Sequence, residues 1–246
     1  LLRGDEAEIG FFRAALACAM YWPEVGISLT TALFPMMSAQ YQARRESFVL
    51  NYQRSVRWLA ALGLPLAVGL CLLADRLVIL LYGEGFLPAV VSLRILSVSV
   101  LLKFIHGALA MVLTSSNRQE LRMSIMAFAA LANIVMNLIL IPRKGHVGAS
   151  VAAVLTDSLI LVTTYFFVTR QLGRLRALAA LVRPAMSAIV MGVYVMLFRR
   201  MSLFALIPTA AIIDLAVLYA LGGIPRDDLA QIKGLFPERW VRWVTG

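Results

Sequence analysis

Charged side chains are scarce in this chain of 246 residues: only 15% are Asp, Glu, Lys or Arg, whereas 61% are hydrophobic. An average soluble domain carries about 25% charged residues. A water-soluble fold of this length could not cover so much apolar surface with so few polar groups. The scarcity of charge therefore excludes an ordinary soluble domain and indicates a protein that is surrounded by lipid.

Cysteine is almost absent as well, and so are the motifs of metal and nucleotide sites. Cys18 and Cys71 both lie inside apolar segments without paired spacing, so we interpret them as small packing residues. The chain has no Walker loop that would cradle a nucleotide phosphate. We therefore expect no metal, no cofactor and no catalytic residue.

Seven apolar stretches make up most of the chain, each separated from the next by proline, glycine or charge. A helix of about 20 apolar residues can cross the hydrocarbon layer with its backbone hydrogen bonds satisfied internally. The pattern predicts an all-α fold, a polytopic transmembrane helix bundle. The expected spans are residues 9–34, 58–74, 88–113, 121–141, 147–169, 184–198 and 203–221.

Three features between and within these spans are expected to shape the bundle. Pro23 should interrupt the first span at its middle, because proline removes a backbone donor. Residues 40–57 form a polar, amphipathic run that should lie along the membrane surface, and 77–82 should form a short interfacial or re-entrant helix. Trp240 and Trp243 are expected to anchor the polar tail at the interface.

The net charge of +10 comes from 23 Lys and Arg against 13 Asp and Glu. Because the basic residues lie at the ends of apolar spans, they fit topology determinants rather than a nucleic-acid surface. One side of the predicted bundle holds fourteen of them and the other six, which puts the richer side and the C-terminus in the cytoplasm. The fourteen are Arg44, Arg45, Arg54, Arg57, Arg118, Arg122, Arg170, Arg174, Arg176, Arg183, Arg226, Lys233, Arg239 and Arg242; the six are Arg3, Arg76, Arg143, Lys144, Arg199 and Arg200.

Four segments in order resemble a known family: EIGFFRAA, TALFPMMSAQ, LGLPLAVGLCLLADRLVILLYGEGF and NIVMNLILIPRKGHVGASVAAVL. Over residues 8–170 the chain resembles the C-terminal half of Wzx-type oligosaccharide-lipid flippases of polysaccharide biosynthesis. These are similar to the lipid II flippases and belong to the multidrug/oligosaccharidyl-lipid/polysaccharide exporter superfamily. The resemblance implies two bundles of six helices around a cavity, in the bacterial inner membrane. Residues 1–170 would be the second bundle, 171–221 two additional transmembrane helices and 222–246 a cytoplasmic tail, with the first bundle upstream.

The function that this resemblance implies is the flipping of a lipid-linked oligosaccharide by alternating access, without covalent chemistry. Its partners would be membrane lipid, the sugar-lipid substrate and the missing first bundle. The energy would come from an ion gradient, the membrane potential or consumption of the product. Two alternatives stay open: a cation-coupled multidrug exporter of the same superfamily, and an integral membrane polysaccharide ligase that uses His106 with Asp157. The basic Arg13 and Lys103 inside the spans argue against the exporter, and the short loops argue against the ligase.

Charged residues inside the spans are the candidate site, because a charge in hydrocarbon is costly and usually faces a cavity or a partner. Arg13, near the outer end of the first span, and Lys103, deep in the third, are expected to bind the substrate pyrophosphate. Arg13 could instead snorkel to the interface. Lys103 could instead pair with Asp157 or Glu24.

Glu24 and His106 are the candidates for ion coupling, since a carboxylate and an imidazole can each take up a proton. The alternatives are a structural ion pair for Glu24 and a satisfied interior imidazole for His106. Asp157 is preferred to Asp214 as a substrate-binding residue, because the resemblance puts the seventh span outside the main bundle.

Asn133 and Asn137 stand four positions apart, on one face of the fourth span. They would either line the cavity and bind substrate or hydrogen-bond a neighbouring helix. Arg94, near one end of the third span, is expected to snorkel. Arg44 and Arg45 are expected to set orientation, with a contact to the anionic substrate before entry as the alternative.

Overall fold

The computed structural model describes residues 6–43, 45–172 and 177–223. Within these ranges the chain folds into α-helices joined by short turns, with no strand, so the predicted all-α membrane bundle is confirmed. The elements are α1 (Glu6–Ala43), α2 (Arg45–Leu72), α3 (Ala74–Tyr82), the single 3-10 turn η1 (Glu84–Phe86), α4 (Ala89–Ser115), α5 (Gln119–Leu172), α6 (Ala177–Leu197) and α7 (Leu203–Ala220).

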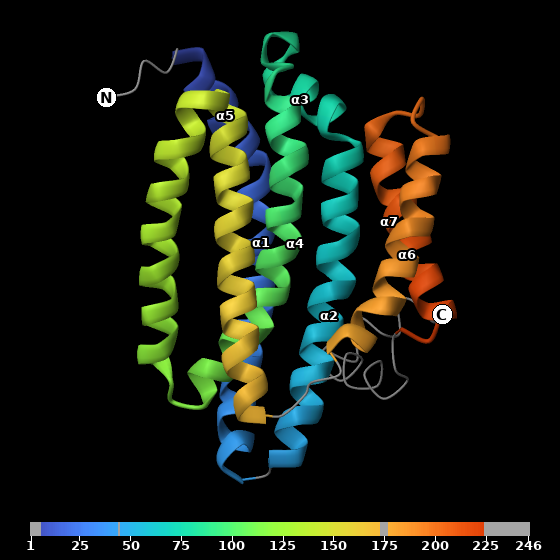
Figure 1. The fold of residues 1–246 in the computed structure, drawn as a ribbon. Helices are drawn as coiled ribbons and strands as arrows, with labels where there is room; N and C mark the ends of the chain where they lie inside the picture. The colour runs from blue at the N-terminus through green and yellow to red at the C-terminus, as the bar shows by residue number, and fades with distance from the viewer. Residues whose placement is uncertain (1–5, 44, 173–176, 224–246) are drawn as a thin grey trace.

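The long helices run up and down side by side, and α5 doubles back on itself (Figure 1). Its two arms, residues 119–144 and 146–172, meet at Gly145, whose φ of 52° and ψ of −133° lie outside the helical region. Glycine adopts such angles without a steric penalty. The predicted break between the fourth and fifth spans is therefore a tight reversal at one residue, and the two arms lie next to each other.

Four helices of the described chain are long and apolar enough to cross a membrane: Phe48–Leu72, Ala89–Ser115, Gln119–Arg170 and Leu203–Ala220. The third of these contains both arms of α5, so it accounts for two of the predicted spans. In α6 the apolar helix Leu181–Leu197 is shorter.

The two ends of the bundle are called the α3 end and the Asn117 end, after an element or residue that lies at each. The α3 end holds the start of α1, α3, Gly145 and the turn between α6 and α7 (Figure 1). The Asn117 end holds the α1–α2 junction, the turn of residues 116–118 and the end of α5. The predicted alternation of breaks agrees with this arrangement, since Arg118 and Arg170 lie at one end and Arg143 and Arg199 at the other.

A cluster of polar and aromatic contacts at the α3 end joins α1, α4 and α5. Glu8 accepts a hydrogen bond of 2.8 Å from the backbone N–H of His146, at the start of the second α5 arm. The His146 ring nitrogen Nδ1 lies 2.9 Å from the Ser92 hydroxyl of α4. Phe11 packs edge-on against the same imidazole, with ring centroids 5.7 Å apart. These contacts fix the reversal of α5 against its two neighbours.

Apolar side chains pack into two clusters. The larger lies among α1, α2, α4 and the arms of α5, and its fully buried members include Phe48, Tyr52 and Phe104. The smaller lies where α6 and α7 meet the end of α2; its buried members are Leu73, Met191, Val195, Leu203, Leu206 and Ala210. Accordingly, α6 packs on α2 and on α7.

Residues 40–57 do not form a separate surface helix, so that prediction is wrong. α1 continues through Pro23 and Pro35 to Ala43, and α2 begins at Arg45. Phe48, Tyr52 and Val56 recur every four positions and are all buried in the larger cluster, which draws this segment into the bundle. Among the polar residues of this segment whose side chains are described, Asn51, Gln53, Arg54 and Arg57 are only partly buried.

Several predicted boundaries match the structure closely. The short helix predicted at 77–82 lies within α3, which begins at Ala74, ends at Tyr82 and is followed by Gly83 with φ of 82°. Pro88 directly precedes α4, and the seventh span is α7. Residues 224–246, with Trp240 and Trp243, lie outside the described residues, as do Arg44 and the side chain of Arg45.

Candidate functional site

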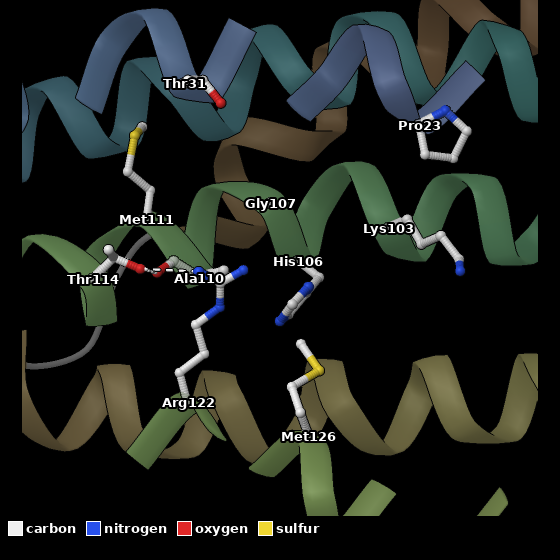
Figure 2. Close-up of a pocket in the computed structure, with 10 residues that line it drawn as sticks. All are labelled: Pro23, Thr31, Lys103, His106, Gly107, Ala110, Met111, Thr114, Arg122 and Met126. Atoms are coloured by element: carbon white, nitrogen blue, oxygen red, sulfur yellow. Dashed lines mark hydrogen bonds between the residues drawn. The ribbon is translucent and has the colours of Figure 1, made fainter. Parts of the chain in front are cut away.

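A pocket of about 440 Å³ lies between α1, α4 and the first arm of α5. α4 supplies most of its wall, and Figure 2 shows its side chains together. The lining residues are Pro23 and Thr31 of α1, Lys103, His106, Gly107, Ala110, Met111 and Thr114 of α4, and Arg122 and Met126 of α5. The pocket therefore extends from the middle of α4 towards the Asn117 end.

Three nitrogen-bearing side chains meet at this pocket, from two helices. Lys103 and His106 stand about one turn apart on α4, so they share a face. Arg122 reaches back from the first turns of α5 and donates a hydrogen bond of 3.2 Å from Nη1 to Oγ1 of Thr114, in the last turn of α4 (Figure 2). This bond engages one nitrogen of a guanidinium that has five donors.

Lys103 forms an ion pair with Asp157 of the second α5 arm, with Nζ 3.6 Å from Oδ1. The Asp157 side chain is only 14% exposed, whereas that of Lys103 keeps 34% of its surface open. An ammonium group has three donors, and the carboxylate occupies one side of it. Lys103 is therefore paired yet still accessible from the pocket. Of the two partners weighed from the sequence, Asp157 is the one that the structure shows.

The His106 imidazole has a free hydrogen-bonding position. Its Nε2 is buried and has no hydrogen-bond partner among the described residues. A buried polar atom without a partner costs about 1–3 kcal/mol, so it usually marks a place for water or ligand. In Figure 2 the ring points from α4 towards Met126 of α5.

α1 carries an exposed polar face, on which Arg13 and Glu24 lie with Thr31. These positions coincide on a helix with about 3.6 residues per turn. Thr31 lines the pocket, but Arg13 lies five turns away towards the α3 end and is not among the lining residues. Glu24 is exposed and makes no ion pair with a described residue. The structure thus brings Lys103, His106 and Asp157 together and leaves Arg13 and Glu24 apart from them.

Asn133 and Asn137 lie between the two arms of α5. Asn133 donates from Nδ2 to the Thr156 hydroxyl at 2.8 Å, which joins the arms. Asn137 donates to Oδ1 of Asn133, also at 2.8 Å. Neither residue lines the 440 Å³ pocket. Asn133 thus forms a hydrogen bond between the two arms, whereas the hydrogen bond of Asn137 stays within the first arm.

Arg122 is the site residue that sequence reasoning missed, because it was assigned to the basic loop at one side of the membrane. The sequence offers one local signal, the short polar turn from Thr114 to Glu120. Asn117 adopts φ of 56°, which closes a tight turn between α4 and α5. A side chain in the first turns after such a reversal can fold back onto the last turns of the preceding helix, as Arg122 does.

The chemistry of the pocket suits an anion. Lys103 and Arg122 contribute two positive charges, and the carboxylate of Asp157 neutralises part of the first. Low dielectric surroundings strengthen the attraction of an anion to such a group. No group of three or more His, Cys, Asp or Glu in the described part of the chain could hold a metal ion.

Comparisons with known proteins agree with the fold and with a membrane location. The family described as lipid II flippase MurJ matches residues 24–215. A solved structure, the lipid II flippase MurJ in an inward closed conformation, superposes with a TM-score of 0.68 at 12% identity and covers 90% of this chain and 48% of that one. An uncharacterized membrane protein in the cps region of Klebsiella pneumoniae is 24% identical over 149 residues, 58% of this chain and 29% of that protein. The chain thus spans about half or less of the length of these relatives.

Proposed function

This chain belongs to the family of the lipid II flippase MurJ, and from that premise we propose that it forms part of a transporter that flips a lipid-linked oligosaccharide across the cytoplasmic membrane. The transporter would serve polysaccharide or cell-envelope synthesis. Membrane passage in such a protein needs no covalent step in the described helices, so the proposal is for a transporter and not an enzyme.

The observation that supports the proposal most is the pocket of Lys103, His106 and Arg122. A lipid-linked sugar carries a phosphate or pyrophosphate between its polar head and its lipid tail. Lys103 would attract this anion with the side of the ammonium that Asp157 leaves open. Arg122 would add a planar donor group, which suits phosphate oxygens. His106 would donate or accept at Nε2, the atom that has no partner among the described residues.

The energetic reason for such a pocket lies in the cost of the lipid core. A polar group without a hydrogen bond costs several kcal/mol in an apolar medium, about 4–8 on the hydrocarbon scale. A sugar head carries many such groups. A cavity with fixed polar donors removes most of this barrier, while the lipid tail stays in the bilayer.

The other half of the cavity would come from a further helix bundle. Related structures are about twice as long as this chain, which covers 48% of the MurJ chain that it matches. Rocking of two bundles about a central site is the usual form of alternating access in transporters built of repeats. The exposed polar face of α1, with Arg13 and Glu24, is the surface that we assign to that partner bundle and to the substrate path.

We assign the Asn117 end to the cytoplasm, because the basic residues predicted to flank the spans are more numerous there. The C-terminus would then be cytoplasmic too. The pocket reaches the first turns of α5 at this end, so it would receive the substrate from the cytoplasmic leaflet, where lipid-linked sugars are built.

A flipping assay in proteoliposomes tests the proposal. The full-length protein would be reconstituted with a fluorescent lipid-linked saccharide, and the fraction accessible to a membrane-impermeant quencher would be followed in time. We expect Lys103→Ala to slow flipping at least about tenfold, since loss of a charged hydrogen bond costs about 1.5–3 kcal/mol. Lys144→Ala is the matched control: Lys144 is exposed at the α3 end, and its variant should flip at the wild-type rate.

The same preparation separates the proposal from its rivals. Absence of flipping in the wild type, together with export of a soluble cationic drug, would replace the flippase with the exporter. Transfer of the saccharide to an acceptor in the same vesicles would replace it with the ligase. Equal rates for Lys103→Ala and Lys144→Ala would remove the pocket from the transport path.

A further inference from the structure

A second pocket, of about 390 Å³, lies at the α3 end of the molecule, where three helices meet. It is lined by Cys71 and Leu72 of α2, Arg94 of α4, Val195 and Met196 of α6, and Arg199 in the turn that follows. Arg94 and Lys103 are nine positions apart, about two and a half helical turns, so they lie on opposite faces of α4. This second pocket is therefore distinct from the one that holds Lys103.

Arg94 has no anionic partner within the described chain. Its guanidinium makes no hydrogen bond or ion pair with a described residue, and it is exposed. The neighbouring positions on the same face of α4 are apolar and open: Val91 is 49% exposed and Val98 46%. A lone positive charge thus stands on a surface that otherwise suits lipid tails.

Arg199 is held in place by two contacts. Its guanidinium pairs with Asp75 at the start of α3. Arg76 donates from Nη1 to the backbone carbonyl of Arg199, at 2.7 Å. The turn between α6 and α7 is thereby fastened to α3, and Arg199 is positioned at the mouth of the second pocket.

Positive charge exceeds negative charge around this mouth. Arg199 and Arg200 also line an adjoining pocket of about 370 Å³, together with Met196, Leu197, Phe198 and Met201. Among the residues that the structure describes, one carboxylate, that of Asp75, contacts this group of arginines, which consists of Arg76, Arg94, Arg199 and Arg200.

We propose that the second pocket binds the phosphate of an anionic phospholipid, between Arg94 and Arg199. The apolar stretches of α2 and α6 end at Leu72 and Leu197, which puts the pocket near the depth of the headgroups. Arg94 lies five positions into α4, about 8 Å along the axis. Its side chain spans that distance by snorkelling, and two guanidinium groups match the oxygens of one phosphodiester.

The apolar part of the lining favours a lipid over a soluble phosphate. Leu72, Val195 and Met196 line the pocket together with the two arginines. Met196 is 62% exposed, and Val98 continues the open apolar surface down α4. Acyl chains of a bound lipid would cover the exposed side chains of Met196 and Val98, whereas a free phosphate would leave both in contact with the bilayer as before.

Native mass spectrometry of the full-length protein tests this site. The protein would be delipidated in mild detergent and titrated with phosphatidylglycerol or with phosphatidylcholine of the same acyl chains. Glycerol 3-phosphate would be added as the soluble competitor. We expect the wild type to retain phosphatidylglycerol in preference to phosphatidylcholine, and Arg94→Gln to weaken that retention about fivefold, because one arginine near a lipid headgroup is worth about 1 kcal/mol.

Arg143→Gln is the matched control, since Arg143 is exposed at the same end but lies outside the second pocket; its variant should retain the wild-type preference. Arg94→Lys keeps the charge without the planar fork and should retain more of the preference than Arg94→Gln. Equal phosphatidylglycerol retention by the wild type and both Arg94 variants would overturn the site. So would an equal loss in Arg143→Gln. Displacement by millimolar glycerol 3-phosphate would assign the site to a free phosphate instead.

Discussion

Polar side chains have different roles in two regions of the molecule, the helices around α4 and the pair α6–α7. Around α4, the pocket brings Lys103, His106 and Arg122 together. Lys103 keeps an open side, and Nε2 of His106 has no partner in the part of the chain that the structure describes. Between α6 and α7, the Ser187 hydroxyl contacts the buried Asp214, and Tyr194 contacts Thr209 at 3.2 Å. In the first region polar groups have capacity left for a ligand. In the second they are used in joining helices.

This difference has a physical basis in what each region adjoins. α4 touches α1, α2 and both arms of α5, so it is the central helix of the bundle. A charged side chain on such a helix is costly unless it pairs with another protein group or faces a water-filled pocket. α6 and α7 lie at the side of the molecule (Figure 1) and expose many large apolar side chains, such as Met186, Ile189 and Phe204. These exposed apolar side chains suit contact with lipid.

The largest expected contrast concerns two arginines that both form hydrogen bonds. Arg122 donates to Thr114 beside the pocket, and Arg183 of α6 donates from Nη1 to the carbonyl of Gly222 at 2.6 Å. We expect Arg122→Ala to slow flipping about tenfold, the effect of losing one charged hydrogen bond. Arg183→Ala should change it less than twofold. Equal losses of flipping rate in the two variants, measured in the same vesicle assay, would contradict the proposed difference between the regions.

The reversal of α5 should be sensitive to a single methyl group. A Cβ at Gly145 would sit 2.1 Å from a Glu8 carboxylate oxygen, and φ there is +52°. Gly145→Ala should therefore destabilise the protein by about 1–3 kcal/mol, seen as a lower midpoint of thermal unfolding in detergent. Gly69→Ala in α2 is the control, because a Cβ there meets nothing within 4 Å. A midpoint that falls in the control and not at Gly145 would contradict the account of the reversal.

Hydrogen bonds between helices should matter equally in the two regions. Asn133→Leu removes the contact between the arms of α5, and Ser187→Ala removes the contact between α6 and α7. Each should cost about 0.6–1.7 kcal/mol of stability, with flipping reduced less than threefold. If Asn133→Leu stops flipping while the thermal midpoint stays unchanged, Asn133 belongs to the substrate path and not to the packing.

The smallest effect is expected at Asp214. This carboxylate is 4% exposed in α7 and contacts Ser187. Asp214→Asn keeps a side chain of the same shape with an acceptor oxygen, so flipping should stay within twofold of the wild type. A loss of tenfold or more at normal protein abundance would give α7 a functional acid and would end the distinction between the two regions.

The fold was largely predictable from the sequence, because apolar length alone decides what can cross a membrane. The predicted ranges 88–113 and 203–221 match α4 and α7 within two residues. The prediction of a surface helix at residues 40–57 was wrong for a clear reason. Its arginines suggested the membrane surface, but Phe48, Tyr52 and Val56 form a buried stripe at helical spacing. Burial of these apolar side chains decides where the segment lies, because long basic side chains can still reach the interface from a buried helix.

The site was predictable only in part. Charge within a span pointed to Lys103 and Asp157, and the structure joins them. The same rule pointed to Arg13 and Glu24, which stay outside the pocket. Hydropathy cannot tell which face of a helix meets a neighbour, and it assigns residues near a turn, such as Arg122, to the loop.

A charge swap tests the central claim that Lys103 serves a ligand and not only Asp157. The double variant Lys103→Asp with Asp157→Lys restores the pair between α4 and α5 but moves the positive charge off the pocket wall. We predict wild-type abundance and thermal stability with flipping still reduced at least about tenfold. Flipping restored to the wild-type rate would show that the pair is purely structural, and would contradict the proposed role of the pocket.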